Sequence, residues 1–176
     1  MSIHFINIVL KLTMEIQQES STNYLWNIWN QCILKIPNTQ YTIRGFSIAA
    51  LRSNFFIKEL NIMLDAGLSG NYSPDHIFVT HTHTDHCASL PYHLYTFNQT
   101  ETKMKIYVPM EAENKTDTLI KSVHTMNGDD FDKNYDIVPV KDGDSFQMEL
   151  KGKIFKIKII KCDHTVPCVG YGILKL

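Results

Sequence analysis

The spacing of hydrophobic and polar residues changes several times along the chain, and these changes predict its elements. Apolar side chains recur at helical spacing over residues 21–36, which predicts a helix that begins near Ser21 or Thr22 and ends before Pro37. Short β-rich runs follow, at residues 41–43, 47–51, 55–58 and 62–64. The last of these runs is expected to be the return arm of a hairpin.

The middle of the chain alternates between strand and helix patterns. Strands are expected at 77–80 and 105–108, and helices at 88–97 and 111–126. The first of these strands is an unbroken apolar run, as in a strand that is buried on both faces of a sheet. Strand, helix, strand and helix in succession are typical of a layered α/β fold.

The last part of the chain is rich in β-forming residues. Strands are expected at 137–140 and 145–150, with a hairpin turn at Asp142-Gly143 between them. Lysine alternates with Ile and Phe over 153–161, which predicts a half-exposed strand; a strip of lysines that contacts phosphate is the alternative. A final strand is expected at 169–174.

Composition and charge fit a single globular domain and point to no partner by themselves. The chain has 176 residues, of which 44% are hydrophobic and 20% charged. Its net charge of −1 provides no global basic field for nucleic acid, although a local patch would suffice. The apolar stretch 3–12 is too short to span a membrane and lacks the features of a signal peptide. We therefore expect an intracellular, cytoplasmic protein without a membrane partner.

The four cysteines include no CxxC pair, so neither a zinc knuckle nor a thioredoxin-like site is expected. Cys162 and Cys168 flank His164. A disulfide between them is one reading, and reduced thiols in a cytosolic protein are the favoured one.

The segment H-x-H-x-D-H at 81–86 is the clearest chemical motif in the chain. It follows an apolar strand, at the end where open α/β sheets place their ligands. Imidazole and carboxylate groups both bind zinc, and a chain of this composition would contain the pattern by chance only about 0.001 times. His81 and His83 are two residues apart and can point the same way. Asp85 and His86 follow where a helix should begin, so they can approach a second metal.

Two further residues are candidates for the same site. Asp65 lies at a strand end, where it is either a turn carboxylate or a support for a metal ligand. His164 follows a long strand and would add a third nitrogen to His81 and His83, which gives the three-ligand pattern of catalytic zinc. The remaining histidines have no such context and are interpreted as surface or helix residues: His4, His76, His93 and His124.

These motifs together resemble the metallo-β-lactamase fold and, within it, ribonuclease Z, the tRNA 3′-processing endonuclease. The resemblance covers 40–176 of the single domain 1–176, with 1–36 as an N-terminal extension and helix. It rests on three segments: Leu64-Asp65-Ala66-Gly67, the metal motif with Leu90-Pro91 after it, and Asp163-His164-Thr165-Val166-Pro167-Cys168-Val169-Gly170-Tyr171. Two departures are Thr84, where ribonuclease Z usually has Gly, and the absence of a recognisable Gly-rich N-terminal strand and loop. The implied fold class is α/β, the N-terminal portion of an αββα sandwich.

The resemblance implies a zinc-dependent phosphodiesterase that removes the 3′ trailer of precursor tRNA, its RNA partner. His81, His83 and His164 would hold one zinc ion, and Asp85 and His86 would belong to a second. Asp85 would also be the general base, and Asp65 would support a ligand. The ions, zinc or else manganese, would lower the pKa of a shared water from about 15.7 toward about 7.

In that fold, a bridging Asp and a final His come from elements beyond Leu176. We therefore expect half of a two-metal site here, in a truncated or split polypeptide or in one completed by a homodimer or a second chain. Other hydrolases of the fold, acting on a cyclic nucleotide or a small ester, remain alternatives. An inactive homologue that binds a single metal is a third reading, so the sequence leaves enzyme activity open.

Overall fold

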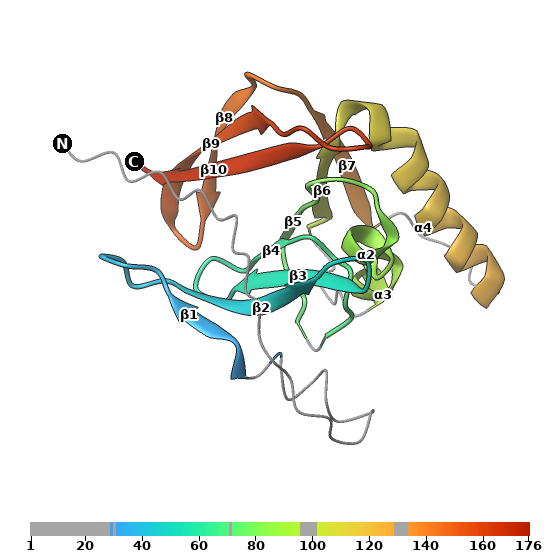
Figure 1. Ribbon diagram of the computed structural model, residues 1–176, viewed down its shortest axis with the longest axis horizontal. Helices are drawn as coiled ribbons and strands as arrows, with labels where there is room; N and C mark the ends of the chain where they lie inside the picture. Colours follow the sequence, from blue (N-terminus) through green and yellow to red (C-terminus); the bar gives the residue numbers. More distant parts are fainter. Residues whose placement is uncertain (1–28, 30, 71, 96–101, 129–133) are drawn as a thin grey trace.

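Two β-sheets and a group of helices lie in layers (Figure 1). The structure, a computed structural model, describes residues 29, 31–70, 72–95, 102–128 and 134–176. The strands are β1 (Ile33–Lys35), β2 (Thr42–Ile48), β3 (Arg52–Ile57), β4 (Ile62–Leu64), β5 (His76–Phe78), β6 (Met104–Pro109), β7 (Tyr135–Val140), β8 (Ser145–Leu150), β9 (Lys153–Lys161) and β10 (Val169–Lys175). The helices are α2 (Thr84–Cys87), α3 (Leu90–Tyr95) and α4 (Glu113–Asn127), with a 3-10 turn η1 (Met110–Ala112) before α4.

The larger sheet has seven strands in the order β1-β2-β3-β4-β5-β6-β7. Neighbours are antiparallel from β1 to β4 and parallel from β4 to β7. In the parallel half, Leu64 pairs with Phe78, and Phe78 pairs with Tyr107. The loops that follow β4, β5 and β6 therefore leave the sheet at one edge, where the candidate motif begins.

A separate hydrophobic core covers each face of this sheet. One core packs the sheet against the helices, and the other packs it against the three-stranded sheet β10-β9-β8. Ile77 belongs to the first core and Phe78 to the second, and both are fully buried. The unbroken apolar run is thus a strand buried on both faces, as predicted. The described residues form the α/β/β layers of the expected αββα sandwich.

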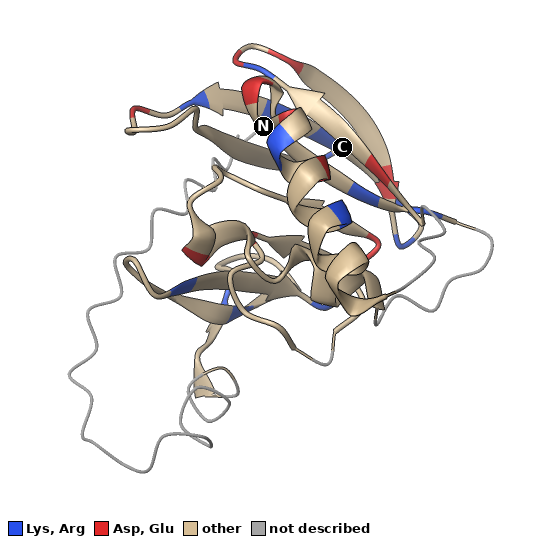
Figure 2. Cartoon of the chain, turned by 90° about the vertical axis from the view of Figure 1, so that its right-hand side faces the viewer, with Lys and Arg blue, Asp and Glu red and all other residues tan. Residues whose placement is uncertain are grey.

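Charged residues of both signs are interspersed over the surface (Figure 2). Several form ion pairs: Lys151 Nζ lies 2.9 Å from Asp75 Oδ2, and Lys121 Nζ lies 2.5 Å from Asp117 Oδ2. In β9, Phe155, Ile157 and Ile159 are buried while the lysines between them are partly exposed, which confirms the predicted half-exposed strand. Lys156 and Lys158 thus lie on the face away from the core.

The helix predicted over 21–36 does not extend to its expected end. Residues 21–28 and 30 lie outside the described part of the chain, but Ile33–Lys35 is a strand that pairs with β2. Backbone hydrogen bonds to the edge of β2 stabilise this short segment as a strand more than its apolar spacing favours a helix.

The strands predicted at 41–43 and 47–51 are the single strand β2, and Gly45 does not end it. Gly45 has a φ of 139° and lies so close to β3 that a Cβ atom would meet Asn54 O at 2.1 Å. Its role is close approach of two strands rather than a turn. The turn comes later, where Ala50 has a φ of 62°.

The turn at Asp142-Gly143 does not join a hairpin, because β7 and β8 belong to different sheets. Gly143 has a φ of 83°, so the turn itself is present. The hairpin of this region joins β8 to β9 through Lys151 and Gly152, which also have positive φ. The Asp-Gly pair correctly predicted a turn at this position. Local sequence does not determine that β8 pairs with β9 and not with β7.

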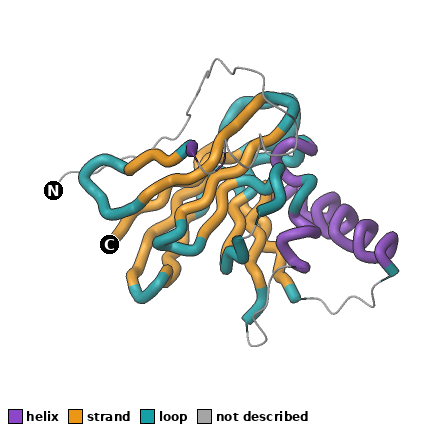
Figure 3. The backbone as a smooth tube through the Cα atoms, turned by 90° about the horizontal axis from the view of Figure 1, so that it is seen from below, coloured by secondary structure: helices purple, strands orange, loops and turns teal. Residues whose placement is uncertain are grey.

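The helices of the middle segment are present with shifted bounds, gathered on one side of the strands (Figure 3). The helix predicted at 88–97 is α3, preceded by the short α2, with residues 96 and 97 outside the described part. The helix predicted at 111–126 is η1 followed by α4. None of the described helices combines the length and apolar character needed to cross a lipid bilayer.

Candidate metal centre

The H-x-H-x-D-H segment runs from the end of β5 into α2, where it packs against the loop after β4. Ala66 N donates a hydrogen bond to His86 O, at 2.6 Å. Gly67 lies against Asp85, since a Cβ atom there would come within 1.6 Å of Asp85 O. The small residues of Asp65-Ala66-Gly67 thus let the metal motif pack directly on the end of β4.

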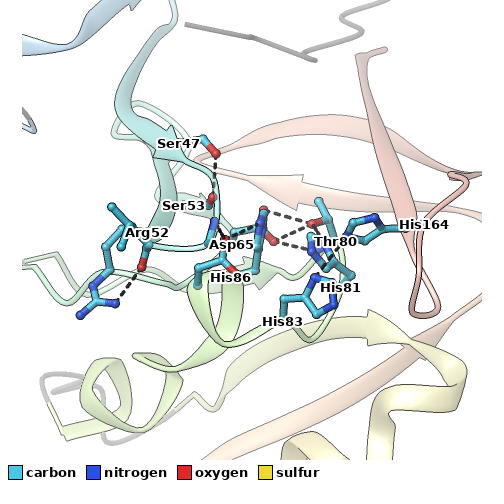
Figure 4. A network of polar contacts seen from close by, with 12 residues as sticks. Ser47, Arg52, Ser53, Asp65, Thr80, His81, His83, His86 and His164 are labelled. Carbon is cyan, nitrogen blue, oxygen red and sulfur yellow. Dashed lines mark hydrogen bonds and ion pairs between the residues drawn. The ribbon is translucent and has the colours of Figure 1, made fainter. Parts of the chain in front are cut away.

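Three imidazoles converge at this edge: those of His81, His83 and His164 (Figure 4). One nitrogen of each ring lies within 4.8 Å of those of the other two. His164 Nε2 is 3.2 Å from His83 Nδ1. His164 comes from the loop between β9 and β10, and Val169 N donates to Thr80 O at 2.9 Å. This hydrogen bond joins the start of β10 to the loop after β5 and so holds the His164 loop next to the motif.

Asp65 lies buried beside the histidines and accepts hydrogen bonds from two neighbours. Thr80 donates to it through its backbone N–H, at 2.7 Å, and through Oγ1, at 3.0 Å. His86 Nδ1 lies 2.8 Å from Asp65 Oδ2. Of the two readings of Asp65, the geometry is that of a carboxylate supporting a candidate ligand.

Asp85 and His86 form a pair beside the three imidazoles. Asp85 Oδ2 accepts a hydrogen bond from Ala50 N at 3.0 Å and lies 3.4 Å from His86 Nε2. The ring centroids of His81 and His86 are 3.9 Å apart. The structure thus brings all five candidate ligands together, as one group of three and one adjoining pair.

Burial and neighbouring charges set different protonation states for the buried histidines. Burial, together with the nearby His86, His164 and His83, lowers the pKa of His81 to about 4. Burial also acts to lower the pKa of His86, but the hydrogen bond and the charge of Asp65 outweigh it, and the pKa is raised. His81 is therefore neutral near pH 7, which is the form that binds a metal.

The group of three fits a zinc ion by its donor chemistry. Its members are imidazole nitrogens, which zinc prefers together with thiolate and carboxylate. His81 Nδ1 lies 3.0 Å from Thr80 Oγ1, and this contact leaves Nε2 of His81 for a metal. With Nδ1 protonated, His81 donates to Thr80, and Thr80 donates to Asp65.

Several supporting residues were missed in the sequence. The hydroxyl of Thr80 bridges Asp65 and His81, and its place directly before the motif was the available indication. Tyr171 donates a hydrogen bond to Val79 O at 2.8 Å, just before the motif. Ala50 contributes only a backbone N–H, which no side-chain pattern reveals. His93 and His124 lie in helices as expected, but both are buried.

A cavity of about 590 Å³ opens beside His164. Charged side chains of both signs line it, among them Glu111, Lys141, Asp142 and Lys161. Of the three imidazoles, that of His164 lines this cavity, together with the side chains of Lys141 and Lys161.

Comparison with known proteins gives both a family and relatives. The model of the family described as anti-Pycsar protein Apyc1 matches residues 45–174. Nuclear ribonuclease Z of Triticum aestivum is 25% identical over 136 residues, covering 76% of this chain and 74% of the relative. Ribonuclease Z of Treponema pallidum is 33% identical over 99 residues, covering 54% of this chain and 29% of the relative.

Among solved structures, the short form of human tRNase Z matches with 17% identity and a TM-score of 0.47, covering 77% of this chain and 57% of its own. The metallo-β-lactamase fold protein YhfI of Bacillus subtilis matches with 16% identity and a TM-score of 0.47, covering 73% of this chain and 53% of its own. The chain thus spans little more than half the length of these two structures.

The matches agree with the motifs. The curated relatives confirm the resemblance to ribonuclease Z that the sequence indicated. The match to the family model extends over more than half of the chain and includes Asp65, the 81–86 motif and His164. The chain therefore belongs to the family described as anti-Pycsar protein Apyc1.

Proposed function

We propose that this chain is a metal-dependent phosphodiester hydrolase of the ribonuclease Z type, acting inside the cell on the 3′ trailer of precursor tRNA. One observation carries the reaction type: three imidazoles and an Asp85-His86 pair meet at one edge of the sheet. RNA as the substrate class is supported by relatives named ribonuclease Z and tRNase Z.

His81, His83 and His164 would hold one zinc or manganese ion, and Asp85 and His86 would contribute to a second. A bound ion would lower the pKa of a water molecule and offset the charge of the scissile phosphate. His81 is suited to its role because burial keeps its imidazole neutral.

The chain itself provides a proton acceptor and a fixed frame for the ligands. Within the described part of the chain, both contacts of the Asp85 carboxylate, with Ala50 N and His86 Nε2, use Oδ2. Its Oδ1 is left to accept a proton from the attacking water, the role of a general base. Asp65 orients His86 directly, and it orients His81 through Thr80.

A small cyclic nucleotide is the second candidate substrate, and the charge pattern favours it. RNA binding draws most of its affinity from basic side chains on phosphates. In the described residues, Lys and Arg are interspersed with Asp and Glu (Figure 2), and Lys121 and Lys151 form ion pairs with Asp117 and Asp75. The cavity of about 590 Å³ beside His164 also has the usual size of a small-molecule pocket.

Further ligands for the second ion are part of the proposal. Asp85 and His86 supply only two donors, too few for a tight site. We infer that a second copy of the chain or another chain adds donors at this edge. Light scattering with and without zinc tests whether a second copy of the chain supplies these donors. A dimer that zinc stabilises supports this arrangement, and a monomer under all conditions contradicts it.

Activity on two substrates tests the function. The whole chain, loaded with zinc, is given a 3′-extended tRNA precursor and, separately, a cyclic nucleotide. Release of the trailer supports the first substrate, and hydrolysis of the cyclic nucleotide alone supports the second. His83→Ala should abolish either activity, whereas His76→Asn, at the opposite end of β5, should retain it. A zinc-loaded chain that hydrolyses neither substrate contradicts both candidates.

A further inference from the structure

Two cysteines face each other at the base of the loop that carries His164. Cys162 N donates a hydrogen bond to Cys168 O at 3.1 Å, which continues the pairing of Lys161 with Val169. Directly opposed residues of antiparallel strands have Cα atoms about 4.5–5.5 Å apart. A disulfide spans Cα separations of about 4.4–6.8 Å, so the backbone already has the required spacing.

The two side chains also lie on the same side of the strands. Directly opposed residues of an antiparallel pair project to one side, and Cys162 is opposed to Cys168 because Lys161 pairs with Val169. Both are free thiols. The sulfur of Cys162 also lies near Gly170, where a Cβ atom would come within 3.3 Å of it. Gly170 thus leaves room for the thiol above the strand.

The exposure of the two thiols differs. Cys162 is exposed and Cys168 is half-buried, and both line the open cavity beside His164. Burial, together with the neighbouring Cys162, raises the pKa of Cys168 to about 11. An oxidant from solvent therefore meets Cys162 first, with Cys168 placed to react second. Cys87, by contrast, is buried in the core between the sheet and the helices.

We propose that Cys162 and Cys168 are a dithiol modification site that a peroxide closes to a reversible disulfide. The Cys162 thiolate attacks one oxygen of hydrogen peroxide, which gives a sulfenic acid and releases hydroxide. The Cys168 thiolate then attacks the Cys162 sulfur, forms the S–S bond and expels a second hydroxide. The two thiol protons combine with the two hydroxides to give two waters. The thiols lose two electrons and the peroxide gains them, and a dithiol reductant reverses the change.

The disulfide would close the loop 163–167, which contains His164. Because the two residues are already paired, the bond forms without a change of strand register. The modification therefore ties both ends of the His164 loop together by a covalent bond. This inference does not depend on the proposed hydrolase activity.

Thiol counting and peptide mapping test the site on the folded, metal-free chain. Treatment with a slight excess of hydrogen peroxide should remove two of the four thiols and give a linked Cys162–Cys168 peptide under non-reducing conditions. Dithiothreitol should restore all four thiols. Cys162→Ser and Cys168→Ser should each abolish the linked peptide, whereas Cys32→Ser should retain it.

Mapping of the unaltered chain also keeps the test valid if a variant fails to fold. Four thiols that persist in the treated chain would overturn the proposal. So would a disulfide between any other pair or between two chains, or a Cys162 sulfinic acid beside a free Cys168 thiol.

Discussion

Replacing Asp65 with asparagine tests whether one buried carboxylate sets the metal-binding state of His86. Asn has nearly the same volume as Asp and shares its tolerance of the left-handed backbone, which matters because Asp65 has a φ of 58°. The Asn oxygen can still accept the hydrogen bond from Thr80 N. Its amide group, a donor, then faces His86 Nδ1, which lies 2.8 Å from Asp65 Oδ2.

The size of the effect follows from that geometry. With a donor opposite, His86 must accept at Nδ1, and its proton moves to Nε2, the nitrogen that faces Asp85. A protonated Nε2 cannot bind a metal. Loss of such a supporting partner costs about 10–100-fold in metal affinity. The folded chain also loses a hydrogen bond to a charged group at a residue that is only 5% exposed, which costs about 1.5–3 kcal/mol of unfolding free energy.

Zinc competition titrations measure the affinity, and urea denaturation of the metal-free chain measures the stability. NMR titration of the metal-free variant should show a lower pKa for His86, because the charge and hydrogen bond of Asp65 that raise it are gone. Asp163→Asn is the matched control, since it makes the same chemical change at an exposed residue beside His164. An Asp65→Asn chain with unaltered zinc affinity would refute the reasoning.

Three further predictions concern the hydroxyl bridge, the packing of the motif and the buried histidines. Thr80→Val should weaken zinc binding about tenfold and Thr80→Ser should retain it, because the hydroxyl links His81 to Asp65; equal losses would contradict this role. Gly67→Ala should lower the unfolding free energy by about 3 kcal/mol in urea, since its Cβ would collide with Asp85 O. Gly128→Ala is the control, because a Cβ atom there has open space around it although the φ is 73°. It should lower the unfolding free energy by about 1–2 kcal/mol. Equal losses of unfolding free energy in Gly67→Ala and Gly128→Ala would contradict the packing argument. The metal-free chain should lose stability as the pH falls from 6.5 toward about 4, because His76 and His81 are held neutral only in the folded state and the unfolded chain binds more protons. His86 has a raised pKa, so it changes the free energy of unfolding only above this pH range. An unfolding free energy from urea denaturation that stays constant between pH 4 and 6.5 would contradict the lowered pKa values of His76 and His81.

The elements that position the site could be predicted because local and tertiary requirements agree there. The run before His81 is apolar on both faces, and the structure buries Ile77 and Phe78 in different cores. A parallel strand buried in this way ends at the edge of the sheet where ligands bind. The sequence around the motif is therefore sufficient to predict its place in the fold. His164 could be predicted for a similar reason, because it follows the long alternating strand β9.

The rest depends on contacts between residues that are distant in sequence. Ile33–Lys35 has helical spacing but pairs with the edge of β2. Gly45 suggests a turn, and only the approach of β3 explains why it lies within a strand. Thr80 and Ala50 act through a hydroxyl and a backbone N–H whose partners are Asp65 and Asp85. No local pattern encodes these pairings.

Zinc content is the most direct test of the central claim, that His81, His83 and His164 hold a metal ion. The measurement is zinc bound per chain by elemental analysis after dialysis, for the unaltered protein, His164→Ala and the control His76→Asn. We predict at least one zinc ion per chain in the unaltered protein and in His76→Asn, and loss of that ion in His164→Ala. Equal zinc in His164→Ala and the unaltered chain would contradict the site described here.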